Sequence, residues 1–280
     1  MSPPSSPSTS GSPAGGSPED GLRLGTVPYL NARPLVEGLA EQPGVELVAD
    51  VPSALLARLR AGELDAALVS AVELFRHPTL AWVAGPAITS DGPVQSILLY
   101  LRVPAEEIRT VALDRSSLSA AAMTRVCLSD LLLVPNATFT DCPPDAPLDA
   151  IDADAVLRIG DPALATSPDG RDVLDLGALW TSKTGLPFVY ALWLVRAGVP
   201  AEPLGSLLRA AAERGMPRRA EMAEAFAAEQ GLPAAACIAY LTERIGFTLG
   251  PAERAGLEAF GRLAHVHGLV DTPVLPEPLA

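Results

Sequence analysis

Cysteine and histidine are scarce in this chain of 280 residues, which contains three of each. Cys127, Cys142 and Cys237 form no CxxC pair, and His265 and His267 are two positions apart, which puts them on different faces of a helix. This pattern argues against a zinc or iron–sulfur site and favours a reduced chain in the cytoplasm. No HExxH, P-loop or GxGxxG pattern occurs, so we expect neither a metal nor an organic cofactor.

Long apolar runs are missing as well. No stretch of about 18 apolar residues occurs, so we expect no membrane-spanning segment and no membrane partner. The first twenty residues, "MSPPSSPSTSGSPAGGSPED", are rich in Pro, Ser and Gly and lack the basic start and apolar core of a secretory signal. We therefore expect residues 1–20 to form a disordered tail and the protein to remain in the cytoplasm.

Positive charge is in deficit, with 20 Lys and Arg against 33 Asp and Glu, which gives a formal net charge of −13. Such a balance argues against a nucleic-acid partner, although a local pocket can still take a small anion. Hydrophobic residues make up 49% of the chain, enough for a globular fold of one large or two smaller domains.

Strand and helix patterns alternate from residue 22 onward. We expect strands at 22–27, 45–49 and 64–69, with helices at 34–40 and 52–61 between them. The first of these helices would begin at Pro34, and Gly62 suits a left-handed residue after the second. This βαβαβ order predicts a parallel sheet with helices on both faces.

The middle of the chain repeats the rhythm, and helices dominate from about residue 196 to His265. Two long apolar strands, 95–101 and 187–195, would connect two α/β lobes, with the ligand cleft between them. We expect lobe 1 to comprise 21–101 plus 190–280, and lobe 2 to comprise 102–189. Further elements are predicted at 110–113, 117–131, 137–140 and 155–159.

Polar side chains gather where strands end and helices begin, the edge of an α/β sheet at which ligands bind. The candidates are Asn31, Ser70, Ser90, Ser96, Ser116, Ser117, Ser119 and Asp161. The serines at 116–119 could form an anion site from hydroxyls and free backbone N–H groups. Ser116 or Ser117 could equally be a plain N-cap, and for Asp161 the N-cap interpretation is favoured over catalysis. Asn31 has no evident turn role.

Five blocks together carry a family resemblance: "VPYLNARPL" (27–35), "PSALLARLRAGELDAALVS" (52–70), "SDGPVQS" (90–96), "IGDPAL" (159–164) and "DLGALWTSKTGLPFVYALWLVR" (175–196). They resemble the chorismate dehydratases of the futalosine route to menaquinone. The resemblance implies a fold similar to type II periplasmic binding proteins, used by a cytoplasmic enzyme without a cofactor. That enzyme would convert chorismate to 3-[(1-carboxyvinyl)oxy]benzoate and water.

By this resemblance, Asn31 and Ser96 fall on positions around the substrate, Asn31 in a catalytic role. Ser70, Ser116, Ser117 and Ser119 are carried over as substrate-binding residues. Ser90 and Asp161 join them because of their places at strand and helix ends. The resemblance does not fix the oligomeric state.

Several alternatives stay open. The proton acceptor could be the enolpyruvyl carboxylate of the substrate itself or a carboxylate of the cleft such as Asp91 or Asp161. The sister enzyme of the same fold makes 1,4-dihydroxy-6-naphthoate and usually carries a Pro-Asn-Asp-Thr block where this chain has Tyr-Leu-Asn. A non-catalytic binding protein for a small carboxylate would share the fold too.

Overall fold

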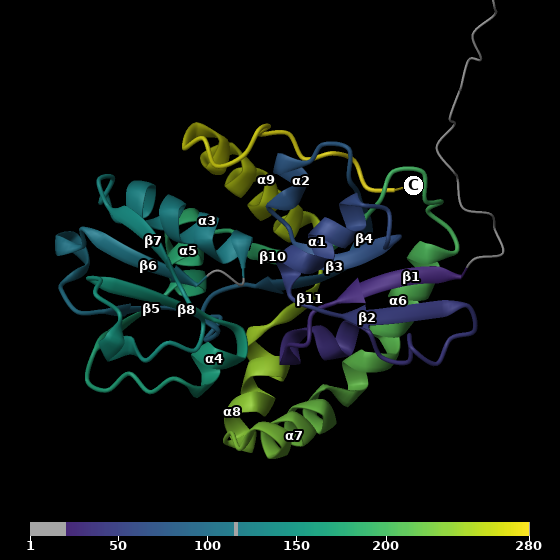
Figure 1. Cartoon of the computed structure of the whole chain (residues 1–280), viewed down its shortest axis with the longest axis horizontal. Coiled ribbons are helices and arrows are strands. Elements are labelled where there is room, and N and C mark those ends of the chain that lie inside the picture. Colours follow the sequence, from purple (N-terminus) through teal and green to yellow (C-terminus); the bar gives the residue numbers. More distant parts are fainter. Residues whose placement is uncertain (1–20, 115–116, 280) are drawn as a thin grey trace, which may run out of the picture.

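The computed structural model describes residues 21–114 and 117–279, so the predicted tail at 1–20 lies outside the described residues. The described chain has a mixed α/β architecture with two sheets, one in each half of Figure 1. The first lobe surrounds a six-stranded sheet with the order β11-β4-β10-β3-β1-β2. Its strands are β1 (Leu22–Thr26), β2 (Val45–Ala49), β3 (Ala66–Ser70), β4 (Ala81–Ser90), β10 (Phe188–Val195) and β11 (Gly246–Thr248).

The second lobe surrounds a five-stranded sheet with the order β7-β6-β8-β5-β9. These strands are β5 (Ile97–Leu101), β6 (Thr110–Asp114), β7 (Thr138–Cys142), β8 (Ala155–Ile159) and β9 (Asp172–Asp175). In each lobe three neighbouring strands are parallel, β2-β1-β3 and β7-β6-β8. The parallel arrangement predicted for the strands at 22–27, 45–49 and 64–69 is therefore confirmed. Both sheets also contain antiparallel pairs, such as β10 with β3 and β5 with β8.

Helices cover the sheets of both lobes (Figure 1). The α-helices are α1 (Pro52–Arg60), α2 (Glu73–Arg76), α3 (Leu118–Val126), α4 (Gly160–Ala165), α5 (Leu176–Thr184), α6 (Leu204–Gly215), α7 (Arg219–Gln230), α8 (Ala234–Ala239) and α9 (Pro251–Val266). The 3₁₀ turns are η1 (Leu30–Leu35), η2 (Ala105–Glu107), η4 (Leu148–Ala150) and η5 (Met216–Arg218). Two π-helical turns, η3 (Cys127–Leu131) and η6 (Tyr240–Arg244), continue α3 and α8.

Local sequence accounts well for α1. Pro52 stands in its first turn, and the buried residues Leu55, Leu56 and Leu59 recur at helical spacing toward the core. After the helix, Gly62 adopts φ +77°, the left-handed conformation that glycine tolerates best. The predicted helix at 52–61 is therefore confirmed to within one residue.

The helix predicted at 34–40 was wrong. The chain instead forms η1, which begins at Leu30 and carries Pro34 inside it. Gly38, at φ +69°, stands where the predicted helix would have continued. Leu30 and Leu35 are fully buried, so packing of the turn onto the lobe fixes it more strongly than the proline signal does.

Strand β4 was not predicted, because Gly85 and Pro86 interrupt its apolar pattern. It pairs with β10 and β11 and lies inside the first sheet. The strand predicted at 95–101 belongs to the second sheet as β5, where it pairs with β8 and β9. The chain therefore passes between the lobes at residues 91–96, before that strand.

An aromatic cluster joins α5, β10 and α9 where the lobes meet. The rings of Trp180, Phe188 and Phe260 pack edge to face, with centroid separations of 4.9 to 6.1 Å. Trp180 is fully buried and donates its indole N–H to the carbonyl of Pro187 at 3.2 Å. This packing holds the start of β10 against the second lobe.

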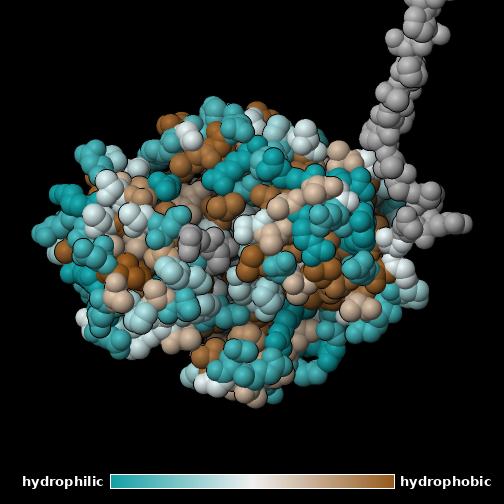
Figure 2. Space-filling model, viewed as in Figure 1, coloured by the Kyte–Doolittle hydropathy of each residue, from teal (hydrophilic) through white to brown (hydrophobic). Residues whose placement is uncertain are grey.

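Figure 2 shows hydrophilic residues over most of the visible face, with smaller apolar areas among them. Across residues 21–114 and 117–279, no helix combines the length and apolar character needed to cross a membrane.

Candidate active site

A pocket lies between the lobes and encloses about 570 Å³ of unfilled space, including its open mouth. The walls come from both sheets and from the segments that connect them. Lining residues are Val27, Tyr29, Asn31, Pro52, Leu68, Val69, Ser70, Ile88, Ser96, Ile97, Ser117, Ile159, Gly160, Tyr190, Ala191 and Ile245.

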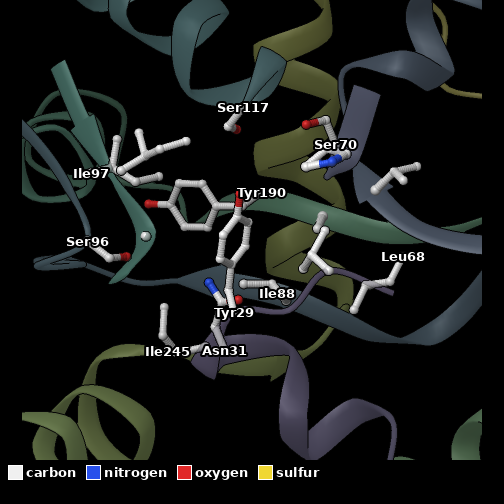
Figure 3. A pocket seen from close by; sticks show the side chains of 16 residues that line it. Tyr29, Asn31, Leu68, Ser70, Ile88, Ser96, Ile97, Ser117, Tyr190 and Ile245 are labelled. Atoms are coloured by element: carbon white, nitrogen blue, oxygen red, sulfur yellow. The ribbon is translucent and has the colours of Figure 1, made fainter. Parts of the chain in front are cut away.

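Asn31 enters the pocket from η1, as Figure 3 shows. The backbone N–H of the preceding residue, Leu30, donates to Asp161 Oδ1 at 3.3 Å, which ties the start of η1 to the second lobe. The side-chain Nδ2 of Asn31 donates to the hydroxyl of Tyr240 at 3.1 Å. Its Oδ1 is buried and accepts no hydrogen bond. A buried acceptor without a donor is costly unless a ligand supplies one.

Ser96 stands on the segment that crosses between the lobes. Before it, Gln95 adopts φ +61°, an uncommon value for a residue with a side chain. The carboxylate of Asp175 holds this turn by accepting from Gln95 N at 2.7 Å and from Val94 N at 3.1 Å. The carbonyl of Ser96 also accepts from Gly160 N at 2.8 Å, so its position is fixed from two sides.

Tyr240 links Ser96 to Asn31. Its hydroxyl donates to Ser96 Oγ at 2.9 Å while accepting from Asn31 Nδ2. The ring is fully buried, and burial raises the pKa of the phenol well above its usual range although both hydrogen bonds oppose the rise. Tyr240 therefore stays protonated and donates one proton.

Ser70 and Ser117 face the pocket from opposite lobes (Figure 3). Ser117 is the N-cap of α3 and accepts from Ala120 N at 3.2 Å, so the N-cap and pocket interpretations both describe it. Ser119 is fully buried behind them, where its hydroxyl accepts from Val72 N at 3.3 Å and its own N–H reaches Ser70 Oγ at 3.5 Å. Ser116 lies outside the described residues.

Two tyrosines supply the aromatic surface of the pocket. The rings of Tyr29 and Tyr190 stand between the polar groups in Figure 3. The hydroxyls of Tyr190 and Ser90 are hydrogen-bonded to each other, 2.8 Å apart. Ser90 is buried and does not line the pocket, so it acts by holding Tyr190.

Neither acidic candidate for the proton acceptor lines the pocket. Asp161 lies in the first turn of α4, whose N-cap is Ile159, so the predicted N-cap role of Asp161 was wrong. Burial raises the pKa of its carboxyl to about 6, while the bond from Leu30 N and the charge of Arg33 lower it. Asp91 is exposed on the segment between the lobes.

Among the residues that the structure describes, the pocket is lined by no Asp, Glu, Lys, Arg or His, and the polar groups of this lining are hydroxyls and one amide. No cluster of three metal-ligating His, Cys, Asp or Glu occurs in the described ranges. The cysteines are separately buried, and burial raises the pKa of each thiol. Neutral donors and acceptors can orient an anion and a hydroxyl without adding a fixed charge.

Three residues of the site, Tyr190, Tyr240 and Ile245, were not among the candidates predicted from the sequence. Tyr240 forms a hydrogen bond with Asn31 but lies far from it in the sequence, and no local sequence pattern indicates that Tyr240 belongs to the site. Tyr190 stands inside an apolar strand, where alternation alone cannot separate a wall of the pocket from the core. Only the register that places Ala191 opposite Ser70 brings this strand to the site.

Comparison with known proteins identifies the family of this chain. A family described as menaquinone biosynthesis matches residues 22–266. The chain belongs to this family. It is also similar to a chorismate dehydratase of Thermus thermophilus, at 29% identity over 257 residues, which cover 85% of this chain and 93% of the relative.

Solved structures extend the likeness in fold. A crystal structure from Archaeoglobus fulgidus superimposes with a TM-score of 0.73 at 16% identity, covering 91% of this chain and all of that one (100%). The periplasmic aliphatic sulphonate binding protein SsuA of Escherichia coli gives a TM-score of 0.64 at 18% identity, covering 94% of this chain and 93% of SsuA. The two-lobed fold of this family member is thus the periplasmic-binding-protein-like fold that the sequence predicts.

Proposed function

We propose that this protein is a chorismate dehydratase, a carbon–oxygen lyase that forms 3-[(1-carboxyvinyl)oxy]benzoate and water in the futalosine route to menaquinone. Membership of the menaquinone biosynthesis family and the similarity to the Thermus thermophilus enzyme support this assignment. The observation that carries it is the pocket, where hydroxyls and an unsatisfied amide oxygen surround a space bordered by two tyrosines.

The substrate suits such a pocket. Chorismate carries a ring carboxylate, an enolpyruvyl carboxylate and a ring hydroxyl. Ser70, Ser96 and Ser117 can donate to carboxylate oxygens, and the first turn of α3 adds a favourable dipole beside Ser117. The free Oδ1 of Asn31 can accept from the ring hydroxyl. The protein thereby holds a flexible dianion in one reactive pose.

Loss of water makes the ring aromatic. The C3–H bond breaks and its electron pair forms the new C3–C4 double bond, while the C4–O bond breaks and the hydroxyl leaves with a proton as water. Because no lining residue in the described ranges 21–114 and 117–279 carries a basic side chain, the enolpyruvyl carboxylate of the substrate is the favoured acceptor of the C3 proton. Asn31 then orients the hydroxyl that leaves.

The remaining expectations belong to the same proposal. The enzyme works in the cytoplasm without metal or organic cofactor and binds no nucleic acid. The first lobe was predicted to comprise 21–101 plus 190–280, and the second 102–189. We now place the first boundary within 91–96, because β5 pairs in the second sheet, and keep the boundary at 189–190. The tail at 1–20 is dispensable.

Incubation of the purified protein with chorismate tests the function. We expect a product that has lost one water and shows the absorbance of a substituted benzoate. Parallel incubation with cyclic dehypoxanthine futalosine tests the sister synthase, and calorimetry with chorismate tests a binding protein without turnover. Conversion of the futalosine compound alone, or binding without product, would replace the proposed activity by one of these.

A further inference from the structure

We propose that Tyr240 is a positioning residue for the reaction, because it fixes the side-chain amide of Asn31 with the oxygen directed at the substrate. The proposal rests on the proposed dehydratase function. It assigns to the helices near the C-terminus a role in the active site.

The direction of the hydrogen bonds sets the orientation of the amide. Tyr240 donates its single proton to Ser96 Oγ at 2.9 Å, so its oxygen can only accept from Asn31. The partner on Asn31 must then be a donor, and Nδ2 lies 3.1 Å away. The other end of the same amide, Oδ1, is left buried and without a donor. A substrate hydroxyl is the group that satisfies it.

Tyr240 reaches this position through a π-helical turn. It is the first residue of η6, and its carbonyl accepts from Ile245 N at 3.1 Å, five positions onward. Ile245 itself lines the pocket, whereas Tyr240 has no exposed surface and does not line it. Tyr240 thus acts through Asn31 and Ser96 and has no contact with substrate.

The chain offers a matched control in Tyr100, on β5 of the second lobe. Its ring is also buried, at 1% exposure, and its hydroxyl donates to the carbonyl of Thr166 at 3.1 Å. Burial raises the pKa of this phenol as well. Tyr100→Phe and Tyr240→Phe therefore remove the same buried hydroxyl and donor, but only the second change affects Asn31.

The first measurement observes the amide directly, without turnover. The sequence contains two asparagines, Asn31 and the exposed Asn136, so protein labelled with ¹⁵N in the asparagine side-chain amide gives two pairs of NMR signals. We expect Tyr240→Phe to move the Asn31 signals and quicken their exchange with water, with Asn136 unchanged. Tyr100→Phe should move neither. Unchanged Asn31 signals in Tyr240→Phe would overturn the proposal.

The second measurement concerns chorismate turnover. Both Tyr→Phe substitutions should lower the melting temperature by similar amounts. Only Tyr240→Phe should also lower kcat, by about tenfold or more, with a smaller change in KM. The double variant Asn31→Ala/Tyr240→Phe should have a kcat only slightly below that of Asn31→Ala alone, because the two residues act as one unit.

Independent, multiplying losses in kcat for Asn31→Ala and Tyr240→Phe would refute the positioning role, as would a kcat for Tyr240→Phe equal to that of Tyr100→Phe. If the wild-type protein fails to convert chorismate, the proposed function fails. The labelled amide still decides whether Tyr240 orients Asn31.

Discussion

Two hollows lie on either side of η1, and their chemistry is opposite. The pocket between the lobes, near 570 Å³, is lined by neutral polar and apolar side chains. The outer groove, near 690 Å³, runs between η1 and α7 and is edged by charged residues, including Arg33, Glu37, Glu41, Arg218 and Glu221. Asn31 faces the first hollow and Arg33, two residues later, borders the second.

Both arginines of the outer groove are paired with carboxylates. Arg33 pairs with Glu229 at 2.6 Å and lies 5.0 Å from the ring centroid of Phe226, and Arg218 pairs with Glu221 and Glu37. Exposed pairs of this kind contribute little because solvent screens them. In the pocket, by contrast, a buried amide oxygen has no donor. The unsatisfied neutral group therefore indicates a ligand site more strongly than many paired charges do.

The largest effect should come from Asn31→Ala. Because this amide orients the leaving hydroxyl, we expect turnover to fall by about 100-fold while the melting temperature stays near that of the wild type. Asn31→Asp should also be impaired, since it adds a negative charge beside a dianion and removes the donor to Tyr240. A stable fold with wild-type turnover in Asn31→Ala would remove Asn31 from the mechanism.

Ser117→Ala should have the next largest effect, and Ser119→Ala makes the matched comparison. Ser117 lines the pocket, so its loss should raise KM by roughly tenfold, the value of one hydrogen bond to a charged group. Ser119 lies behind the wall, where its hydroxyl binds Val72 N, so its loss should lower melting temperature first. Equal effects of both changes on KM would mean that the serine at the start of α3 is not the contact.

Asp161→Asn should change stability in a pH-dependent way. Burial raises the carboxyl pKa from 3.8 to about 6, so its contribution to stability is complete below the unfolded value and is lost as pH rises through 6. The Asn variant keeps an acceptor for Leu30 N without the charge. We expect it to gain roughly 1–2 kcal/mol over the wild type above the folded pKa, and little in acid. Thermal unfolding of both proteins, measured from below pH 3.8 to above pH 6, tests the direction of this change. A variant less stable than the wild type at neutral pH would contradict the prediction.

Arg33→Ala should have the smallest effect. This substitution removes the ion pair with Glu229 and one side chain that lines the outer groove, but it changes no residue that lines the pocket between the lobes. We expect kcat and KM for chorismate to stay within about twofold of the wild type, because no interaction with the substrate is removed. A KM raised tenfold would place the anion site in the groove and reverse the comparison.

Much of the pocket could be predicted because strand ends meet at one edge. Asn31 comes after β1 and Ser70 is the last residue of its parallel neighbour β3, so their convergence follows from the strand order. Tyr240 could not be predicted, since its place depends on the packing of η6 against a distant part of the chain. Strand β4 was not predicted for a local reason, since Gly85 and Pro86 interrupt its apolar sequence pattern.

The most direct test of the central claim compares chorismate conversion by the wild type, Asn31→Ala and Arg33→Ala, followed by the mass of the product. We expect the wild type and Arg33→Ala to release the dehydrated product at similar rates, while Asn31→Ala, though folded, releases it far more slowly. The account would be contradicted if the wild type leaves chorismate unchanged, or if Arg33→Ala fails while Asn31→Ala works normally.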